Sequence, residues 1–360
     1  MSKILKNKKL MIIIGAIVVA AIALTLILVF ALGGDKEGQP AAQVPPPVGP
    51  VVPEPEPPAP EVTTPKQLTY PLTGLPAPDE ASRLRRPLSV KIENTPEARP
   101  QMGISRADVV YETLTEGGIT RFNCIFQSTI PAEVGPVRSA RNSDISIVPQ
   151  YDALFFYSGA NSVVNSQIRA ANLANMASAN IYYRVNYRPA PHNLYLHLSE
   201  AYTAATGRGL SVTVEKAHEL QFLDEAPSVT PDSRTITVPF SRSFTARWEW
   251  NDANQVYYRY MGSQTIDVDG DRAIAAKNVV VLWASYIPLP NVLQGQTFAL
   301  DMNGSGRASL FIAGKRFDGT WISDGTNPPH FVDAQGNAIK LAPGQTWFQV
   351  LNTDQDITVS

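Results

Sequence analysis

The spacing of hydrophobic residues divides the chain into three kinds of sequence. An unbroken apolar run covers residues 10–32, a proline-rich stretch covers 33–69, and short apolar segments recur from residue 70 to the end. A run of about 20 apolar residues is long enough to cross a bilayer. We therefore expect a basic cytoplasmic tail (1–9), a transmembrane anchor (10–32), an extended linker (33–69) and globular sequence beyond it.

The lysines that precede the apolar run predict its orientation. Positive flanks stay in the cytoplasm, so the globular part is expected outside a cell membrane that the chain crosses once. A cleavable signal has a shorter apolar core of about 7–15 residues, which favours an uncleaved anchor, although the small residue Ala31 leaves cleavage open. Lipid attachment is not expected, because no cysteine follows the run directly.

Residues 70–225 mix strand and helix patterns. Alternation predicts a strand over Leu88–Glu93, and a nearly continuous apolar run predicts a buried strand over Ala153–Tyr157. Asn161 is a good N-cap for a helix that extends to about Ala174, and another strand is expected at Asn193–Leu198. Strands that alternate with helices, together with one hairpin, predict an α/β (α+β) domain with a mixed sheet.

Residues 226–360 show short strand patterns and no long helical period, which favours a smaller, mostly-β domain built as an antiparallel barrel or sandwich. The expected strands are Thr235–Phe240, Phe244–Trp250, Val256–Tyr260, Val279–Ala284, Thr297–Met302, Ala308–Ile312, Gly319–Ile322 and Thr346–Leu351. The segment Asp267–Asp271 imitates the start of a calcium loop. Its twelfth position is Asn278 rather than glutamate, so a hairpin turn is the better interpretation.

One predicted hairpin contains several of the charged residues that are candidates for a site. Two alternating runs flank Gly117-Gly118, which is typical of a two-residue turn. In that register Glu116 pairs with Ile119, and Glu112, Glu116 and Arg121 share one face of the sheet. The alternative is an ion-paired surface hairpin without a function in binding.

The sequence after the hairpin adds further positive charge. Ser139 is a possible N-cap for a helix that begins near Ala140, and it lies between Arg138 and Arg141. Guanidinium groups bind phosphate or carboxylate in a bidentate manner, and helix-start amides add partial positive charge. We therefore predict Arg121, Arg138, Ser139 and Arg141 as ligand-binding residues. Asn193, in a second polar loop, completes this set.

The same region contains candidate acids and bases. Glu93, Glu112, Glu116 and His192 are the catalytic candidates, because paired carboxylates with different pKa values can divide acid and base roles and histidine titrates near neutrality. The alternative for His192 is a histidine hydrogen-bonded within its own loop. No nucleophile motif or phosphate-binding glycine loop is present in the sequence, so an enzyme is not established.

Composition narrows the classes of partner. The net charge is −2 and the pI is about 6.1, so no basic field favours nucleic acid. Cys124 is the one cysteine, which excludes an internal disulfide and a cysteine-based metal site. We expect neither a metal nor a cofactor. The expected partners are the membrane, through the N-terminal helix, and an anionic envelope polymer or glycan; no protein partner is indicated.

Several motifs together resemble the YerB-like family of bacterial envelope proteins. They are PLTG at 71–74, VKIENTPEARPQ at 90–101, ADVVYETLTEGGITRF at 107–122, GPVRSAR at 135–141, APHNLY at 190–195 and PGQTWFQV at 343–350. The resemblance implies two domains outside the cytoplasm, often attached through a lipoprotein signal, and no established activity. Three hypotheses follow: a module that binds an anionic envelope ligand, a hydrolase or transferase that acts on such a ligand, and a scaffold for envelope enzymes.

Overall fold

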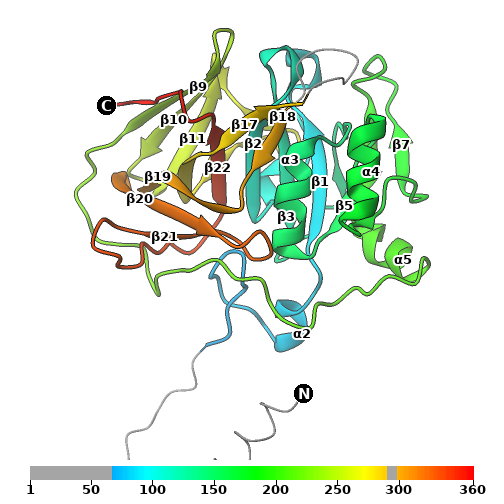
Figure 1. The fold of residues 1–360 in the computed structure, drawn as a ribbon, viewed down its shortest axis with the longest axis horizontal. Coiled ribbons are helices and arrows are strands. Elements are labelled where there is room, and N and C mark those ends of the chain that lie inside the picture. The colour runs from blue at the N-terminus through cyan, green and yellow to red at the C-terminus, as the bar shows by residue number, and fades with distance from the viewer. Residues whose placement is uncertain (1–66, 290–297) are drawn as a thin grey trace, which may run out of the picture. The chain divides into compact units, whose positions relative to one another are not determined.

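The structure is a computed structural model, and it describes residues 67–289 and 298–360 (Figure 1). The expected cytoplasmic tail, the expected anchor and nearly all of the expected linker lie outside the described residues. Within the described ranges, no helix has both the length and the apolar character needed to cross a membrane.

Short helices and many strands make up the described chain. The α-helices are α2 (Glu80–Arg83), α3 (Asn142–Ile147), α4 (Ser162–Ala170) and α5 (Ala201–Thr206), and the 3₁₀ turns are Pro96–Ala98, Ile104–Arg106, Glu116–Gly118, Val148–Tyr151 and Leu198–Glu200. The strands before residue 226 are β1 (Leu88–Glu93), β2 (Val109–Leu114), β3 (Thr120–Phe126), β4 (Glu133–Val134), β5 (Leu154–Phe156), β6 (Ala174–Asn175), β7 (Tyr182–Arg184) and β8 (Leu194–His197).

The strands after residue 226 are β9 (Thr235–Ser241), β10 (Phe244–Asn251), β11 (Val256–Met261), β12 (Ser263–Gln264), β13 (Ile266–Asp267), β14 (Arg272–Ala273), β15 (Ala275–Ala276), β16 (Asn278–Trp283), β17 (Ser285–Pro288), β18 (Phe298–Asp301), β19 (Gly304–Ile312), β20 (Lys315–Ser323), β21 (His330–Val332), β22 (Thr346–Leu351) and β23 (Thr358–Val359). A mostly-β chain with a mixed sheet and few helices is therefore observed.

A ten-stranded mixed sheet forms the centre of the fold. Its strand order is β21-β20-β19-β16-β22-β2-β3-β1-β5-β6, so five strands from each side of residue 226 share it. A second sheet contains β12-β11-β10-β9-β23, and a small one contains β4-β8-β7. Helices α3 and α4 lie side by side in front of β1 and β5 (Figure 1). The boundary predicted at 225/226 stays a prediction, but the strands on its two sides are hydrogen-bonded to each other.

Several local predictions are confirmed. β1 has the predicted bounds, and all six of its residues are buried because it lies inside the large sheet with both faces covered. Asn161 caps α4, since its Oδ1 accepts a hydrogen bond from the Val164 amide at 2.8 Å, although the helix ends at Ala170 rather than Ala174. A hairpin is present at Asp267–Asp271, where β13 and β14 pair.

The antiparallel barrel or sandwich predicted for the C-terminal part is wrong. β22 pairs in parallel with β16 on one side and with β2 on the other. The strand therefore completes a sheet begun by the first half of the chain. Local spacing predicts strands but carries no information about a partner that is far away in sequence.

The predicted register of the charged hairpin is wrong by one residue. Leu114 pairs with Thr120, and Thr113 faces Arg121, because the loop contains three residues, Glu116–Gly118, instead of two. Gly117 and Gly118 have φ values of 75° and 73°, which glycine adopts without strain. A slip of one residue moves side chains to the opposite face of a sheet. Glu112 and Arg121 therefore lie on different faces.

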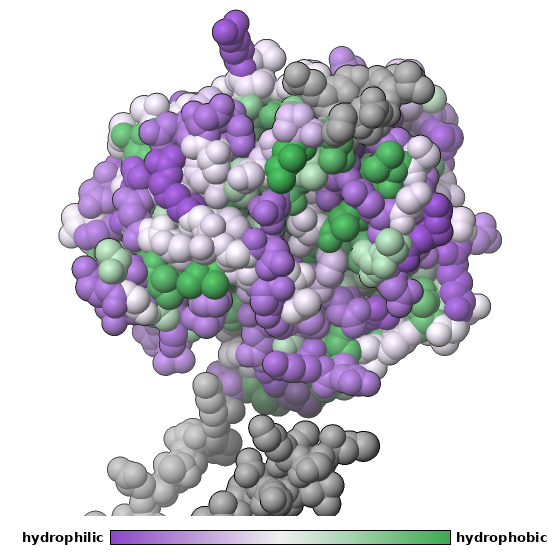
Figure 2. Space-filling view, in the orientation of Figure 1, coloured by the Kyte–Doolittle hydropathy of each residue, from purple (hydrophilic) through white to green (hydrophobic). Residues whose placement is uncertain are grey.

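The two faces of the central strands differ in character. On the face covered by α3, polar residues from β1 and β3 meet; they are Ser89, Lys91, Glu93, Arg121 and Asn123. On the opposite face Phe122, Trp347 and Trp248 form a chain of edge-to-face ring contacts at 5.3 and 5.1 Å. The outer surface is mixed: on the side seen in Figure 2, hydrophobic residues are scattered among polar ones. The unusual polarity is thus inside the molecule, beside α3.

Candidate functional site

Glu93 is the centre of the candidate site. It ends β1, its side chain has no solvent exposure, and its Oε1 atom lies 3.1 Å from Arg138 Nε and 3.0 Å from His192 Nδ1. Thr95 Oγ1 donates a third contact to the same oxygen at 3.1 Å. The second oxygen, Oε2, is buried and has no hydrogen-bond partner among the described residues. The His192 contact is a hydrogen bond, whereas Arg138 Nε lies at ion-pair distance without one, so Glu93 orients His192 directly and holds Arg138 by charge.

Backbone pairing explains the position of Arg138. The segment Gly135–Arg138 lies along the end of β1: Glu93 donates its amide to Pro136 O at 2.9 Å, and Arg138 donates its amide to Lys91 O at 2.9 Å. On its other side, Val137 donates its amide to Leu194 O in β8 at 2.7 Å. The segment acts as a short strand between β1 and β8, which brings Arg138 next to Glu93.

Two further arginines lie nearby. Arg141 Nε forms an ion pair with Glu116 Oε2 at 2.7 Å, and Arg121 Nη1 donates to Ser139 O at 3.0 Å. Burial and the adjacent Arg141 lower the pKa of Arg121 to about 10. Burial raises the pKa of Glu116, but the charge and hydrogen bond of Arg141 have the opposite and larger effect. The pKa of Glu116 is therefore lowered. The structure therefore brings Arg121, Arg138 and Arg141 together, as predicted, but with Glu93 and Glu116 rather than Glu112.

The predicted helix start at Ser139 is wrong. Helix α3 begins at Asn142, because Asp144 Oδ2 accepts the Arg141 amide at 2.7 Å and thereby satisfies a free amide at the helix N-terminus. Ser139 contributes its carbonyl oxygen, which accepts from both Arg121 and Arg141. The helix has six residues, and the site uses the side chain of its N-cap residue, Arg141, rather than the amides of its first turn.

A buried lysine, which sequence reasoning missed, holds Asp144. Lys91 Nζ donates to Asp144 Oδ1 at 2.6 Å, both side chains are completely buried, and Asn123 Nδ2 donates to the same oxygen at 3.1 Å. Burial lowers the pKa of Lys91 although Asp144 opposes the change. The sequence did contain a signal for this ion pair. A lysine inside the strand Leu88–Glu93 needs a buried partner of opposite charge.

His192 and Asn193 have different surroundings. The His192 side chain is 18% exposed, and its Nε2 atom makes no hydrogen bond within the described chain. Asn193 Oδ1 accepts from Arg184 Nη1 at 2.6 Å, and its Nδ2 donates to Val185 O at 3.1 Å. Asn193 therefore closes the loop between β7 and β8, while His192 presents a nitrogen to solvent.

Glu112 belongs to a separate cluster on the opposite face of the sheet. Both of its oxygens accept from Arg259 Nη2, at 2.8 and 2.9 Å, and both residues are at most 1% exposed. The Arg259 guanidinium lies 5.2 Å from the Phe122 ring centroid and 5.4 Å from that of Trp347. Glu112 thus binds a core arginine that sequence reasoning did not single out.

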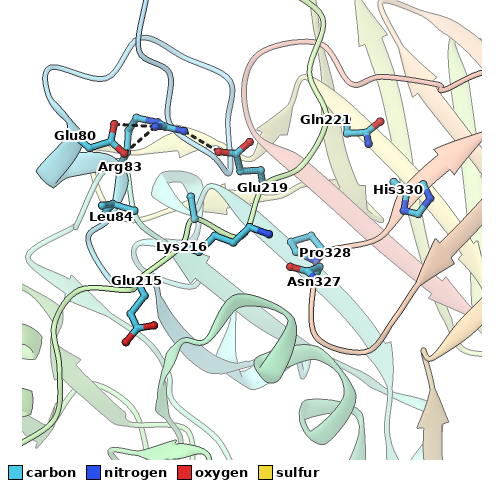
Figure 3. Close-up of a pocket in the computed structure, with 11 residues that line it drawn as sticks. Glu80, Arg83, Leu84, Glu215, Lys216, Glu219, Gln221, Asn327, Pro328 and His330 are labelled. Carbon is cyan, nitrogen blue, oxygen red and sulfur yellow. Dashed lines mark hydrogen bonds and ion pairs between the residues drawn. The ribbon is translucent and has the colours of Figure 1, made fainter. Parts of the chain in front are cut away.

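A pocket in another part of the molecule is shown in Figure 3. It has a volume of about 540 Å³ and is lined by α2, by residues 215–221 and by residues 327–330. Arg83 there already has both of its carboxylate partners, Glu80 at 2.8 Å and Glu219 at 2.7 Å. None of the predicted site residues lines this pocket. Its one arginine is thus already paired, which makes it a weaker candidate for anion binding than the Glu93 cluster, the group formed by Glu93, Glu116, Arg121, Arg138, Arg141 and His192.

The Glu93 cluster combines a buried charge with outward-facing donors. Three arginines oppose two glutamates, Glu93 and Glu116, which leaves a formal excess of one positive charge. The terminal nitrogens of Arg138 form no hydrogen bond in the part of the chain that the structure describes, and its side chain is 22% exposed. An arrangement of this kind can bind an anion. In residues 67–289 and 298–360, no group of three or more His, Cys, Asp or Glu residues is suited to hold a metal ion.

Comparison with known proteins identifies relatives of both halves of the chain. Residues 72–211 match the family described as "Protein of unknown function (DUF3048) N-terminal domain", and residues 236–348 match the corresponding C-terminal domain. The chain is 30% identical over 296 residues to "Putative lipoprotein YerB" of Bacillus subtilis (strain 168), which covers 80% of this chain and 87% of the relative.

A solved structure agrees with this relationship. The crystal structure of the YerB protein from Bacillus subtilis matches with a TM-score of 0.74 and 27% sequence identity, over 82% of this chain and 100% of that one. Sequence and structure therefore give the same result for the globular part: the chain belongs to the YerB-like family and matches both its N-terminal and its C-terminal domain.

Proposed function

We propose that the chain is a membrane-attached protein outside the cytoplasm that binds an anionic envelope ligand, such as a phosphate-bearing polymer or a carboxylated glycan, at the Glu93 cluster. The location is supported by the lipoprotein name of its relative and by the apolar run at residues 10–32. In this proposal a transmembrane helix anchors the chain where a lipid would anchor a lipoprotein. The globular part lies on the same side of the membrane in both cases.

One observation carries the binding proposal. A completely buried carboxylate, Glu93, uses a single oxygen to hold both Arg138 and His192, whose outer nitrogens have no protein partner among the described residues. Fixing the two side chains reduces the conformational entropy lost when a ligand binds. Arg121 and Arg141 supply additional positive charge behind them, so an anion would meet a preorganised and uncompensated cationic edge.

The test is a binding titration with inorganic polyphosphate and with polygalacturonate, at low and at moderate salt. Arg138→Lys keeps the positive charge beside Glu93 but removes the planar fork, so we expect about tenfold weaker binding without unfolding. The matched control is Arg242→Lys, in the exposed turn between β9 and β10, which should bind as the wild type does. Unchanged affinity of folded Arg138→Lys and Arg141→Lys for both polymers would contradict the proposal.

A hydrolase or transferase is the second candidate, and the contact between Glu93 and His192 favours it. A carboxylate that holds Nδ1 fixes the orientation of the imidazole and leaves Nε2 available as a general base. The same titration distinguishes the two functions when the length of the polymer is measured afterwards. Shortening that disappears in His192→Gln would indicate an enzyme, whereas intact polymer would indicate a binding protein.

A further inference from the structure

A second pocket lies where the two domains meet, and Arg138 is not among the residues that line it. Its volume is about 360 Å³, within the range of small-molecule sites. One wall is the segment Pro96–Gln101 of the N-terminal domain, and the other is Met261 with Ser263–Ile266 of the C-terminal domain. Pockets that bind small molecules occur preferentially between domains.

Arg99 is held rigidly at the edge of this pocket. Its Nε donates to Asn94 Oδ1 at 3.2 Å, its Nη2 donates to Asn94 O at 2.7 Å, and its guanidinium lies 5.3 Å from the centroid of the Phe244 ring. These bonds use two of the five N–H groups of the guanidinium. Nη1 makes no hydrogen bond or ion pair in the described residues, so the Nη1–Nη2 edge can receive a two-oxygen acceptor.

Arg99 forms no ion pair with any described residue. The buried carboxylate that acts on it electrostatically, Glu112, is paired with Arg259, whose Nη2 lies 3.1 Å from Sδ of the pocket-lining Met261. Burial and the proximity of Arg259 lower the pKa of Arg99, while Glu112 and Glu97 only partly oppose this effect. A cation in this situation is stabilised by an incoming anion.

The remaining walls indicate the class of ligand. Pro96 and Pro100 have no amide hydrogen to donate, and Met261 and Ile266 add apolar surface. One guanidinium edge matches one carboxylate, and Arg99 is the only charged residue that lines the pocket, since Gln101, Ser263, Gln264 and Thr265 are neutral. We propose that this pocket binds a small carboxylate-bearing molecule, with Arg99 holding the carboxylate and Met261 contacting the apolar part next to it.

The experiment uses the full chain in detergent micelles with ¹³C-methyl-labelled methionine. The Met261 signal is assigned from its loss in Met261→Leu, and N-acetyl-Ala-Ala is titrated against the same dipeptide with an amidated C-terminus. We expect a saturable shift of the Met261 signal with the free acid and none with the amide. Arg99→Ala should weaken binding by about tenfold or more, since a charge-assisted bidentate contact is lost.

Two further variants serve as controls. Arg242→Ala removes an exposed arginine elsewhere and should leave the titration unchanged. If Arg99→Ala does not fold, Ser263→Trp, on the exposed strand β12, fills the pocket and should abolish the shift. The proposal is overturned if the amide shifts Met261 as the acid does, if inorganic phosphate alone produces the shift, or if folded Arg99→Ala binds as the wild type.

Discussion

Two buried glutamates on opposite faces of one sheet have different roles in this molecule. Glu112 is saturated: Arg259, Asn94 and Thr120 all contact its oxygens. Glu93 has one oxygen without a hydrogen-bond partner in residues 67–289 and 298–360, and its other oxygen contacts two groups that reach solvent. A saturated buried pair contributes mainly to the unique structure of the core, whereas an incompletely satisfied carboxylate can still accept a hydrogen bond from a further donor.

The sequence could indicate both glutamates but not distinguish them. The motif around Glu93 and the hairpin around Glu112 each place a carboxylate in an alternating strand, and the face on which it lies depends on the length of one turn. Because the loop has three residues instead of two, Glu112 lies on the face opposite to Arg121 rather than on the same face. Arg259 lies 147 residues further along the chain, so no local pattern could pair it with Glu112.

A pH-dependent stability difference is predicted at Glu116. Arg141 lowers the pKa of this carboxyl below its ordinary value of 4.5, so its ionised form stabilises the folded state above that value. This contribution is lost as the pH falls through the lowered pKa. Urea unfolding at pH 7 and at about pH 3 should therefore show that the wild type loses more stability on acidification than Glu116→Gln. Equal losses in the two proteins would exclude this role of the ion pair.

Among the elements, regular strands were predictable and connecting segments were not. β1 and β22 have the bounds that alternation and apolar runs predict, because each is held on both sides within the sheet. The segment Gly135–Arg138 has no strand pattern, yet it pairs with both β1 and β8 and positions the candidate anion-binding arginine. Tertiary hydrogen bonds, rather than local preference, determine its conformation.

Close packing at Gly135 is predicted to hold the segment Gly135–Arg138 in position. A Cβ atom at residue 135 would lie 2.5 Å from the Tyr195 ring, which is completely buried and cannot move freely. Gly135→Ala should lower the free energy of unfolding by about 1–3 kcal/mol, as overpacked sites do. Chemical denaturation provides the measurement.

The matched control for Gly135→Ala is Gly207→Ala. There the nearest atom to the added Cβ is Thr203 O at 3.5 Å, an ordinary contact, and the φ angle of −60° suits alanine. Its stability should be unchanged or slightly higher. If the two variants had the same stability, the packing of Tyr195 against Gly135 would not hold the segment in place.

For the whole molecule, the shared sheet makes the two conserved domains interdependent. β22 lies between β2 and β16, and its Trp347 contacts Phe122 of the N-terminal domain and Trp248 of the C-terminal domain. A chain of residues 67–225 would expose the edge of β2 and one face of Phe122. We predict that it shows no cooperative thermal unfolding by circular dichroism, in contrast to residues 67–360. A sharp transition in the shorter chain would show that the N-terminal domain folds alone.

The position of β22 also has a consequence for synthesis. β2 comprises residues 109–114, and its neighbour comprises residues 346–351, so everything between them must be translated before the two strands meet. At about 5–20 residues per second, that interval is on the order of tens of seconds. During this time the nascent polypeptide has an unpaired strand edge, which attracts other chains. Export of an unfolded chain, with the last neighbour added on the far side of the membrane, would avoid a half-built sheet in the cytoplasm.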